Sequence, residues 1–154
     1  MIKRLKEKLY KQIPLTKYMQ IDIKELTKKD LITTAPIEPN INDKMTGFAG
    51  SLSTLVTISA WSACYLCVEE KLGFKDAMIA IIKSDTSYRA PVTKELFCKT
   101  ILPTQEEVDK LKDKLLLKGS GSLKVKSQII ENGKTCVDFQ GVYVIKIKQN
   151  KEEN

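Results

Sequence analysis

Polar and small side chains that could bind a substrate gather between Asn40 and Ser51, in the segment NINDKMTGFAGS. Its asparagines, aspartate and threonine offer amide, carboxylate and hydroxyl groups, and its glycines let a ligand approach the backbone closely. If a helix begins here, its first N–H groups lack intrahelical acceptors and favour negative charge. Such a place can bind a phosphate, or the oxyanion that develops when a carbonyl is attacked. Simple capping of the helix by Asn, Asp and Thr, which occurs at most helices, also explains the same residues.

The helix that must position these groups is predicted by the uncharged stretch that follows. No charged residue occurs from Met45 to Val68, and apolar or small residues occupy every side of the segment. A helix of this kind is buried all round, in a membrane or in a protein core. Seven hydroxyl side chains lie on it, and the rest of the chain alternates as soluble strands do. We therefore expect a core helix and no membrane span.

The chain contains no histidine. This absence excludes Ser-His-Asp and Cys-His catalysis, zinc-histidine hydrolysis and any imidazole general base. Chemistry in this protein must therefore use carboxylates, amides, hydroxyls, lysines or backbone groups.

The net charge of +7 comes almost entirely from lysine, because only Arg4 and Arg89 are arginines. Nucleic-acid binders depend on arginine for base contacts and on aromatic residues for stacking. Aromatic residues make up only 6% of this chain. A dispersed coat of lysines is typical of a solvated surface, and it also suits an anionic partner such as coenzyme A or an acidic carrier protein. We expect no nucleic acid among the partners.

Four cysteines are present, at positions 64, 67, 98 and 136. A zinc site normally needs two close-spaced pairs or accompanying histidines, and the sequence offers neither. We expect buried free thiols that pack as small apolar residues, and no metal site.

The length of 154 residues fits one domain, residues 1–154. Residues 1–13 place Ile2, Leu5, Leu9 and Ile13 at helical spacing, and residues 149–154 are expected to fray. The basic N-terminus lacks the apolar core of a secretory signal, so we expect a cytoplasmic protein.

Alternation and turn signals predict the remaining elements. Strands are expected at 19–24, 30–35, 77–84 (a central strand), 96–102, 123–131 and 134–148. Asn132-Gly133 joins the last two as a hairpin, and Thr104-Gln-Glu-Glu107 is a capping box that begins a helix ending at Gly119. The sum is an α+β domain in which an antiparallel sheet wraps around one long central helix.

At this point the residues resemble a known family. The order of elements is similar to the hot-dog fold of acyl-thioester enzymes. The pattern N-x-N-x-x-x-T-x-F-x-G-S, from Asn40 to Ser51, resembles the entry to the central helix in the thioesterase domain that forms the C-terminal part of bacterial YiiD proteins. The likeness covers about residues 13–147, including the strand end SYRAP from Ser87 to Pro91.

The resemblance implies a thioesterase that hydrolyses acyl-CoA or an acyl-carrier thioester, with coenzyme A only as part of the substrate and no separate cofactor. It also implies a homodimer, with a tetramer as a further possibility, whose pockets combine one protomer's central helix with its neighbour's loop. The residues expected in catalysis are Asn42, Asp43, Gly50 and Thr57. Those expected to bind substrate are Asn40, Thr46, Phe48, Ala49, Ser51, Thr54, Tyr88 and Arg89.

One position departs from the pattern of related thioesterases. Many carry Asp or Glu about nine residues after the motif's F/H-x-G, and that position here is Thr57. Another branch uses an Asp in the loop before the helix, where this chain has Asp43. The roles implied are oxyanion binding by N–H groups near Ala49 and Gly50, orientation by Asn42, and positioning of water by Ser51 and Thr57. Asp43 would act as the general base or, alternatively, as the nucleophile. Two alternatives stay open: an acyl-thioester binding module without turnover, and a lysine-driven nucleic-acid binder.

Overall fold

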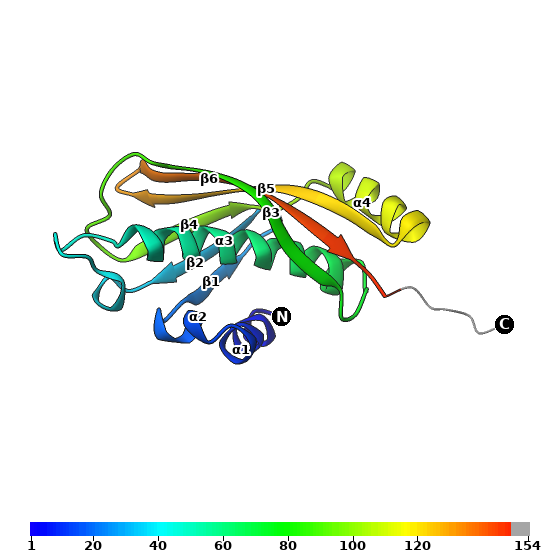
Figure 1. Ribbon diagram of the computed structural model, residues 1–154, viewed down its shortest axis with the longest axis horizontal. Coiled ribbons are helices and arrows are strands. Elements are labelled where there is room, and N and C mark those ends of the chain that lie inside the picture. Colours follow the sequence, from blue (N-terminus) through cyan, green and yellow to red (C-terminus); the bar gives the residue numbers. More distant parts are fainter. Residues whose placement is uncertain (149–154) are drawn as a thin grey trace.

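The computed structural model describes residues 1–148, and it consists of a six-stranded antiparallel sheet that curves around one long helix (Figure 1). The strands lie in the order β1-β2-β4-β5-β6-β3. Their bounds are β1 Asp22–Leu26, β2 Asp30–Ala35, β3 Met78–Tyr88, β4 Leu96–Ile101, β5 Ser120–Glu131 and β6 Lys134–Lys146. This arrangement confirms the predicted α+β class and the antiparallel sheet. The predicted frayed tail, 149–154, lies outside the described residues.

The central helix α3 spans Ala49–Tyr65 and continues as a π-helical segment, η2, over Leu66–Lys71. Residues on nearly every side of it are buried, as expected for a helix without a polar face. The whole of Ala49–Lys71 is long and apolar enough to cross a membrane, but 72% of its most apolar window is buried inside the protein. The prediction of a core helix is confirmed.

Two short helices precede the sheet. Helix α1 spans Ile2–Gln12 and buries Leu5 and Leu9. The sequence predicted one helix within residues 1–13, but a second one, α2 (Pro14–Tyr18), follows it, because proline suits the first position of a helix. The first strand consequently begins at Asp22 and not at Met19, which lies at the end of α2.

The strand expected at the centre of the sheet lies at its edge instead. Strand β3 pairs only with β6, and Met78, Ile81, Ile82 and Tyr88 on it are exposed. An apolar run alone cannot distinguish a central strand from an edge strand that awaits a partner. The pairing register shifts between Ile81 and Lys83, which marks a bulge at Ile82.

The second half of the chain follows its local signals closely. Asn132 and Gly133 both have positive φ, 52° and 75°, as a two-residue hairpin turn requires. Helix α4 spans Gln105–Lys118, begins with the predicted capping box at Thr104, and ends at Gly119 with φ 75°. A short 3-10 helix, η1 (Glu38–Asn40), stands between β2 and the entry to α3.

The core between the sheet and α3 contains a small set of polar groups. Thr33 and Ser59 share a hydrogen bond of 2.6 Å, and Thr100 and Ser127 share one of 2.7 Å, all four side chains being fully buried. All four cysteines are free and buried, as predicted.

Candidate functional site

The N-terminus of α3 carries no side-chain cap. Phe48 occupies the capping position in an extended conformation, and no side chain of the described residues bonds to the helix end there. The first intrahelical bond runs from the Leu52 N–H to the Phe48 carbonyl, 3.0 Å. The N–H groups of Ala49, Gly50 and Ser51 therefore have no acceptor within residues 1–148. The capping by Asn, Asp or Thr that could have explained the motif does not occur at this helix end.

A pocket of about 360 Å³ adjoins this helix end. Its wall combines α2, η1 and the first two turns of α3, and it is formed by Leu15, Tyr18, Met19, Pro39, Asn40, Phe48, Gly50, Ser51 and Thr54. Five of the residues predicted as site residues therefore come together: Asn40, Phe48, Gly50, Ser51 and Thr54. Apolar side chains provide most of the remaining wall, so the pocket combines backbone donors with an apolar surface.

Asn40 is the buried polar residue of this pocket, with 1% exposure. Its Nδ2 donates to the carbonyls of Met19 (3.0 Å) and Pro36 (2.8 Å), which fixes the orientation of the amide. A flipped amide would set Oδ1 against two carbonyl oxygens. The Oδ1 atom is buried and has no hydrogen-bond partner among the described residues. Asn40, the last residue of η1, thus joins η1 to the end of α2 and to Pro36 after β2, and it leaves one acceptor unsatisfied.

Asn42 and Thr46 organise the loop itself. The Asn42 Oδ1 accepts from the Lys44 N–H (2.8 Å) and the Thr46 N–H (3.1 Å), and its Nδ2 donates to the Thr46 hydroxyl (2.9 Å). The Gly47 N–H donates to the Val92 carbonyl at 2.7 Å, which joins the loop to the segment after β3. The two residues predicted to touch the substrate here are engaged in shaping the loop, and neither lines the pocket.

Asp43, Tyr88 and Arg89 lie outside the pocket. The Asp43 side chain is 85% exposed, and its nearest cation is the Lys44 ammonium at 3.5 Å. Tyr88 is exposed at the end of β3, and the Arg89 guanidinium donates to the Asp138 carboxylate at 3.0 Å. The protomer alone therefore does not bring its candidate base to the candidate oxyanion site.

Thr54 and Thr57 both bond back to their own helix. The Thr54 hydroxyl donates to the Gly50 carbonyl (2.8 Å) and the Thr57 hydroxyl to the Ser53 carbonyl (2.7 Å). The Thr57 carbonyl accepts from the buried Tyr143 hydroxyl at 2.7 Å, and burial raises the pKa of that phenol. Thr57 is half-buried but does not line the pocket; its hydroxyl satisfies the helix backbone.

Sequence reasoning missed the part of the wall that α2 provides, namely Leu15, Tyr18 and Met19. Two of these, Leu15 and Tyr18, are large hydrophobic side chains that stay exposed in the protomer. Pro14 was the available signal, because a proline often begins a helix and would have placed Leu15 and Tyr18 on one face of it.

Comparison with known proteins gives a consistent result. Residues 2–147 match the family described as "Putative thioesterase (yiiD_Cterm)". The crystal structure of the "putative thioesterase" from Shewanella oneidensis has 30% sequence identity and a TM-score of 0.84, over 96% of this chain and 97% of that one. A protein of unknown function from Chlorobaculum tepidum TLS has 30% identity and a TM-score of 0.88, over 95% and 94%. A thioesterase family protein from Silicibacter pomeroyi, at 10% identity and a TM-score of 0.67, shares the fold.

The family match covers nearly the whole chain, and the two structures with 30% identity superpose over 95–96% of it. This chain belongs to the thioesterase family of the YiiD C-terminal domain and has the hot-dog fold.

Proposed function

We propose that this protein hydrolyses an acyl thioester of coenzyme A or of an acyl carrier at the N-terminus of α3. The observation that carries the proposal is the uncapped helix end, with the free N–H groups of Ala49, Gly50 and Ser51 beside an apolar-walled pocket. An acyl thioester is complementary to both features: its carbonyl oxygen can accept hydrogen bonds from the N–H groups, and its hydrocarbon chain can pack against the apolar wall.

The thioester carbonyl would accept hydrogen bonds from the N–H groups of Ala49 and Gly50. The helix dipole adds positive potential at this end, so negative charge that develops on the carbonyl oxygen is stabilised. Gly50 suits this role because a side chain there would meet the Phe48 ring. The Ser51 hydroxyl makes no hydrogen bond within residues 1–148 and would position the attacking water.

Asp43 would act as the general base. It takes a proton from water while the water oxygen bonds to the thioester carbon; the C–S bond then breaks, and the proton passes to the leaving sulfur. The products are a carboxylic acid and a thiol. Because Asp43 is exposed in its own protomer, we propose that it serves the site of a second copy.

Dimer formation through β3 would bring the loop into that position. Strand β3 is a free edge with exposed apolar residues, and the Gly47–Val92 hydrogen bond places the Asp43 loop next to the segment that follows β3. A second copy that extends the sheet at this edge would therefore approach the loop. Arg89 and the surface lysines would attract the phosphates of coenzyme A, and the cytoplasm is the compartment we expect.

Turnover on acyl-CoAs from acetyl to palmitoyl tests the proposal. The loss of thioester absorbance should be followed directly, because a thiol reagent could react with the four cysteines. We expect hydrolysis with an optimum chain length. If no chain length is hydrolysed or bound, the proposal fails.

Replacement of Asp43 by Asn tests the base. We expect kcat to decrease by about 10²–10⁴-fold while stability is unchanged, because the side chain is exposed. Mixing this variant with an inactive variant at the helix end, and allowing subunits to exchange, should restore part of the activity if Asp43 acts across the dimer. Full kcat in Asp43→Asn would contradict the role.

A second candidate is an acyl-thioester binding module without turnover. The observation that favours it is that no carboxylate lines the pocket in the described part of the chain. Tight binding of acyl-CoA without hydrolysis, measured by calorimetry, would support this candidate against the enzyme.

A further inference from the structure

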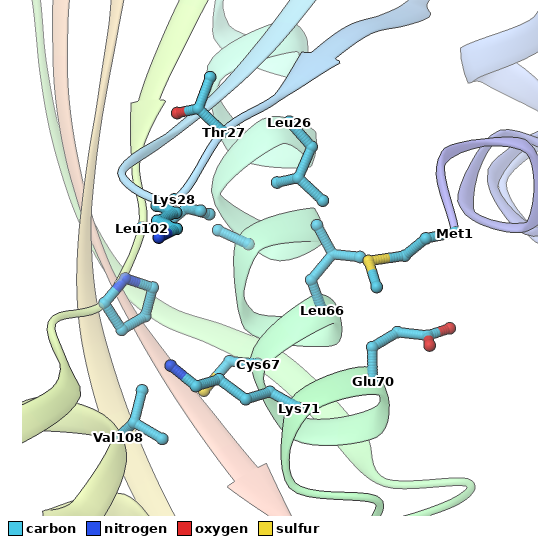
Figure 2. Close-up of a pocket in the computed structure, with 12 residues that line it drawn as sticks. Met1, Leu26, Thr27, Lys28, Leu66, Cys67, Glu70, Lys71, Leu102 and Val108 are labelled. Atoms are coloured by element: carbon cyan, nitrogen blue, oxygen red, sulfur yellow. The ribbon is translucent and has the colours of Figure 1, made fainter.

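A second pocket, of about 310 Å³, lies at the opposite end of the central helix, where α3 passes into η2 (Figure 2). It is lined by Met1, Leu26, Thr27, Lys28, Ala63, Leu66, Cys67, Glu70, Lys71, Leu102, Pro103 and Val108. Gly50 and Leu66 are separated by about 24 Å along the helix at 1.5 Å per residue. The pocket is therefore distinct from the site proposed for hydrolysis.

The wall of this pocket is apolar and comes from separate elements. Leu26 ends β1, Leu66 begins η2, Leu102 follows β4, and Val108 lies in the first turns of α4. The π-helical segment is itself unusual, because π-helices are rare and occur often at functional sites. Such a wall favours a hydrocarbon ligand over water.

The charged groups at this pocket leave positive charge unpaired. Lys28 and Lys71 are both exposed, and neither forms an ion pair within residues 1–148. Glu70 is paired with Arg4 at 3.8 Å. In Figure 2 the Lys71 side chain extends past Cys67 toward the Val108 side, whereas the Glu70 carboxylate points the opposite way. The rim therefore attracts an anion.

We propose that this pocket binds a free fatty acid, with its hydrocarbon chain against Leu26, Leu66 and Val108 and its carboxylate between Lys28 and Lys71. The volume lies at the lower end of the range for ligand sites, about 300–1,000 Å³, which suits a single hydrocarbon chain. A fatty acid belongs to the product class of the proposed hydrolysis, but the binding stands whether or not the protein is an enzyme.

Calorimetry with unbranched fatty acids of increasing length, and with the alcohols of the same length, tests the proposal on the full chain. We expect affinity to rise by about fourfold per added methylene until the pocket is full. Burial of one methylene raises the base-10 logarithm of the association constant by about 0.6. Alcohols should bind about tenfold more weakly, since they lack the charge that the lysines pair. Equal affinity of acid and alcohol would overturn the role of the lysines.

Charge variants test the head-group contact. Lys28→Met and Lys71→Met keep the apolar stems and remove the ammonium groups, so each should weaken binding of the acid and leave binding of the alcohol unchanged. Lys75→Met is the matched control, because Lys75 is exposed and does not line the pocket. If the control weakens binding as much as the two variants do, the effect is one of net charge and the site assignment is wrong.

Variants with a larger side chain in the pocket test where the fatty acid binds. Ala63→Met places a larger side chain inside the pocket and should abolish binding. If circular dichroism shows that this variant is unfolded, Leu102→Trp, at a half-buried position of the wall, takes its place. Undiminished binding in a folded pocket-filling variant would show that the acid binds elsewhere, for example at the N-terminus of α3, and would overturn the proposal.

Discussion

At the scale of single residues, Asn40 and Asn42 show how near neighbours in a motif can differ in their contacts. Asn40 is buried and bonds to backbone carbonyls of Met19 and Pro36, whereas Asn42 bonds within its own loop. Together they shape the entry to α3 without capping it. The absence of a side-chain cap leaves the backbone N–H donors at this helix end free.

Gly50 offers a sharp test at this scale. A Cβ at this position would meet the Phe48 ring, so Gly50→Ala must displace Phe48 from the pocket wall. We expect kcat/KM to decrease by about 10- to 100-fold, because small misplacements in a site are costly. Stability should rise slightly, since alanine favours a helix by about 1 kcal/mol over glycine.

The control for Gly50→Ala is the double variant with Phe48→Leu, which relieves the contact. It should recover part of the lost activity. Steady-state kinetics and thermal unfolding of the three proteins give the two readouts. A loss of stability that parallels the loss of activity would contradict the explanation.

At the scale of elements, α3 is fixed against the sheet by buried polar contacts as well as by apolar packing. The Thr33–Ser59 hydrogen bond, 2.6 Å, joins β2 to α3 in the middle of the core. Ser59 thus bonds to the sheet, whereas Thr57 bonds back to its own helix. Within residues 1–148, one side-chain hydrogen bond joins α3 to the edge strand β3: the Trp61 indole N–H donates to the Ile79 carbonyl at 3.2 Å.

Ser59→Ala should therefore destabilise the protein by about 1–3 kcal/mol, because it leaves the buried Thr33 hydroxyl without a partner. In the double variant Thr33→Val with Ser59→Ala, the loss should be smaller than the sum of the single losses. Denaturant unfolding measures all three. Ser53→Ala, on the half-exposed side of α3, is the control and should change stability by no more than about 0.5 kcal/mol. If the losses of stability in Thr33→Val and Ser59→Ala add up strictly in the double variant, the hydrogen bond contributes nothing.

At the scale of the whole molecule, the protomer has a packed core and a six-stranded sheet that ends at β1 on one side and at β3 on the other. Exposed apolar residues lie on β3, and the candidate base of the same protomer points to solvent. Both features fit an assembly of at least two copies. The assembly would complete the sheet and the site at once.

Ile82→Lys should convert the dimer that we propose into a monomer. Ile82 is 64% exposed on β3, and a lysine at a sheet edge opposes pairing with another strand. Sedimentation velocity of wild type and variant measures the change, and turnover should fall with it. Leu117→Lys is the control, because Leu117 is 80% exposed on α4, away from β3. A wild-type protein that sediments as a monomer would contradict the dimer and the shared site.

Stability should decrease at alkaline pH. Burial raises the pKa of the Cys64 and Cys98 thiols and raises that of Cys67 to about 11, whereas an unperturbed thiol titrates near 9.0. Above pH 9 the unfolded chain loses thiol protons that the folded chain keeps, so folding becomes less favourable as the pH rises. The slope should reach up to about 1.4 kcal/mol per pH unit for each thiol.

Denaturant unfolding at pH 7, 9 and 10.5 measures this slope. Cys67→Ala removes one of the raised thiols and should show a shallower decline, which for Cys67 ends near pH 11. An identical slope in the variant would mean that other groups cause the decline.

Local signals in the sequence determined much of this protein. Residues 30–35 were predicted to be a strand and form β2 with the same bounds, and the capping box at Thr104 and the Asn132-Gly133 turn occur where the sequence places them. The core helix followed from its uncharged, apolar length. These features depend on residues within a few positions of one another, so their physics is contained in the sequence pattern.

Only the tertiary structure decided which segments of the chain lie next to one another. The apolar run of β3 has the same pattern whether it is buried or at an edge, and the pairing of distant strands placed it at the edge. The pocket at α3 needs Leu15 and Tyr18 from α2, and the second pocket needs Leu26, Leu66 and Val108 from three elements. The buried Asn40 amide donates to the carbonyl of Met19, which lies 21 residues earlier in the chain. Such contacts form when segments far apart in the sequence bury their apolar faces against one another. A local sequence pattern does not predict which segments will pack together.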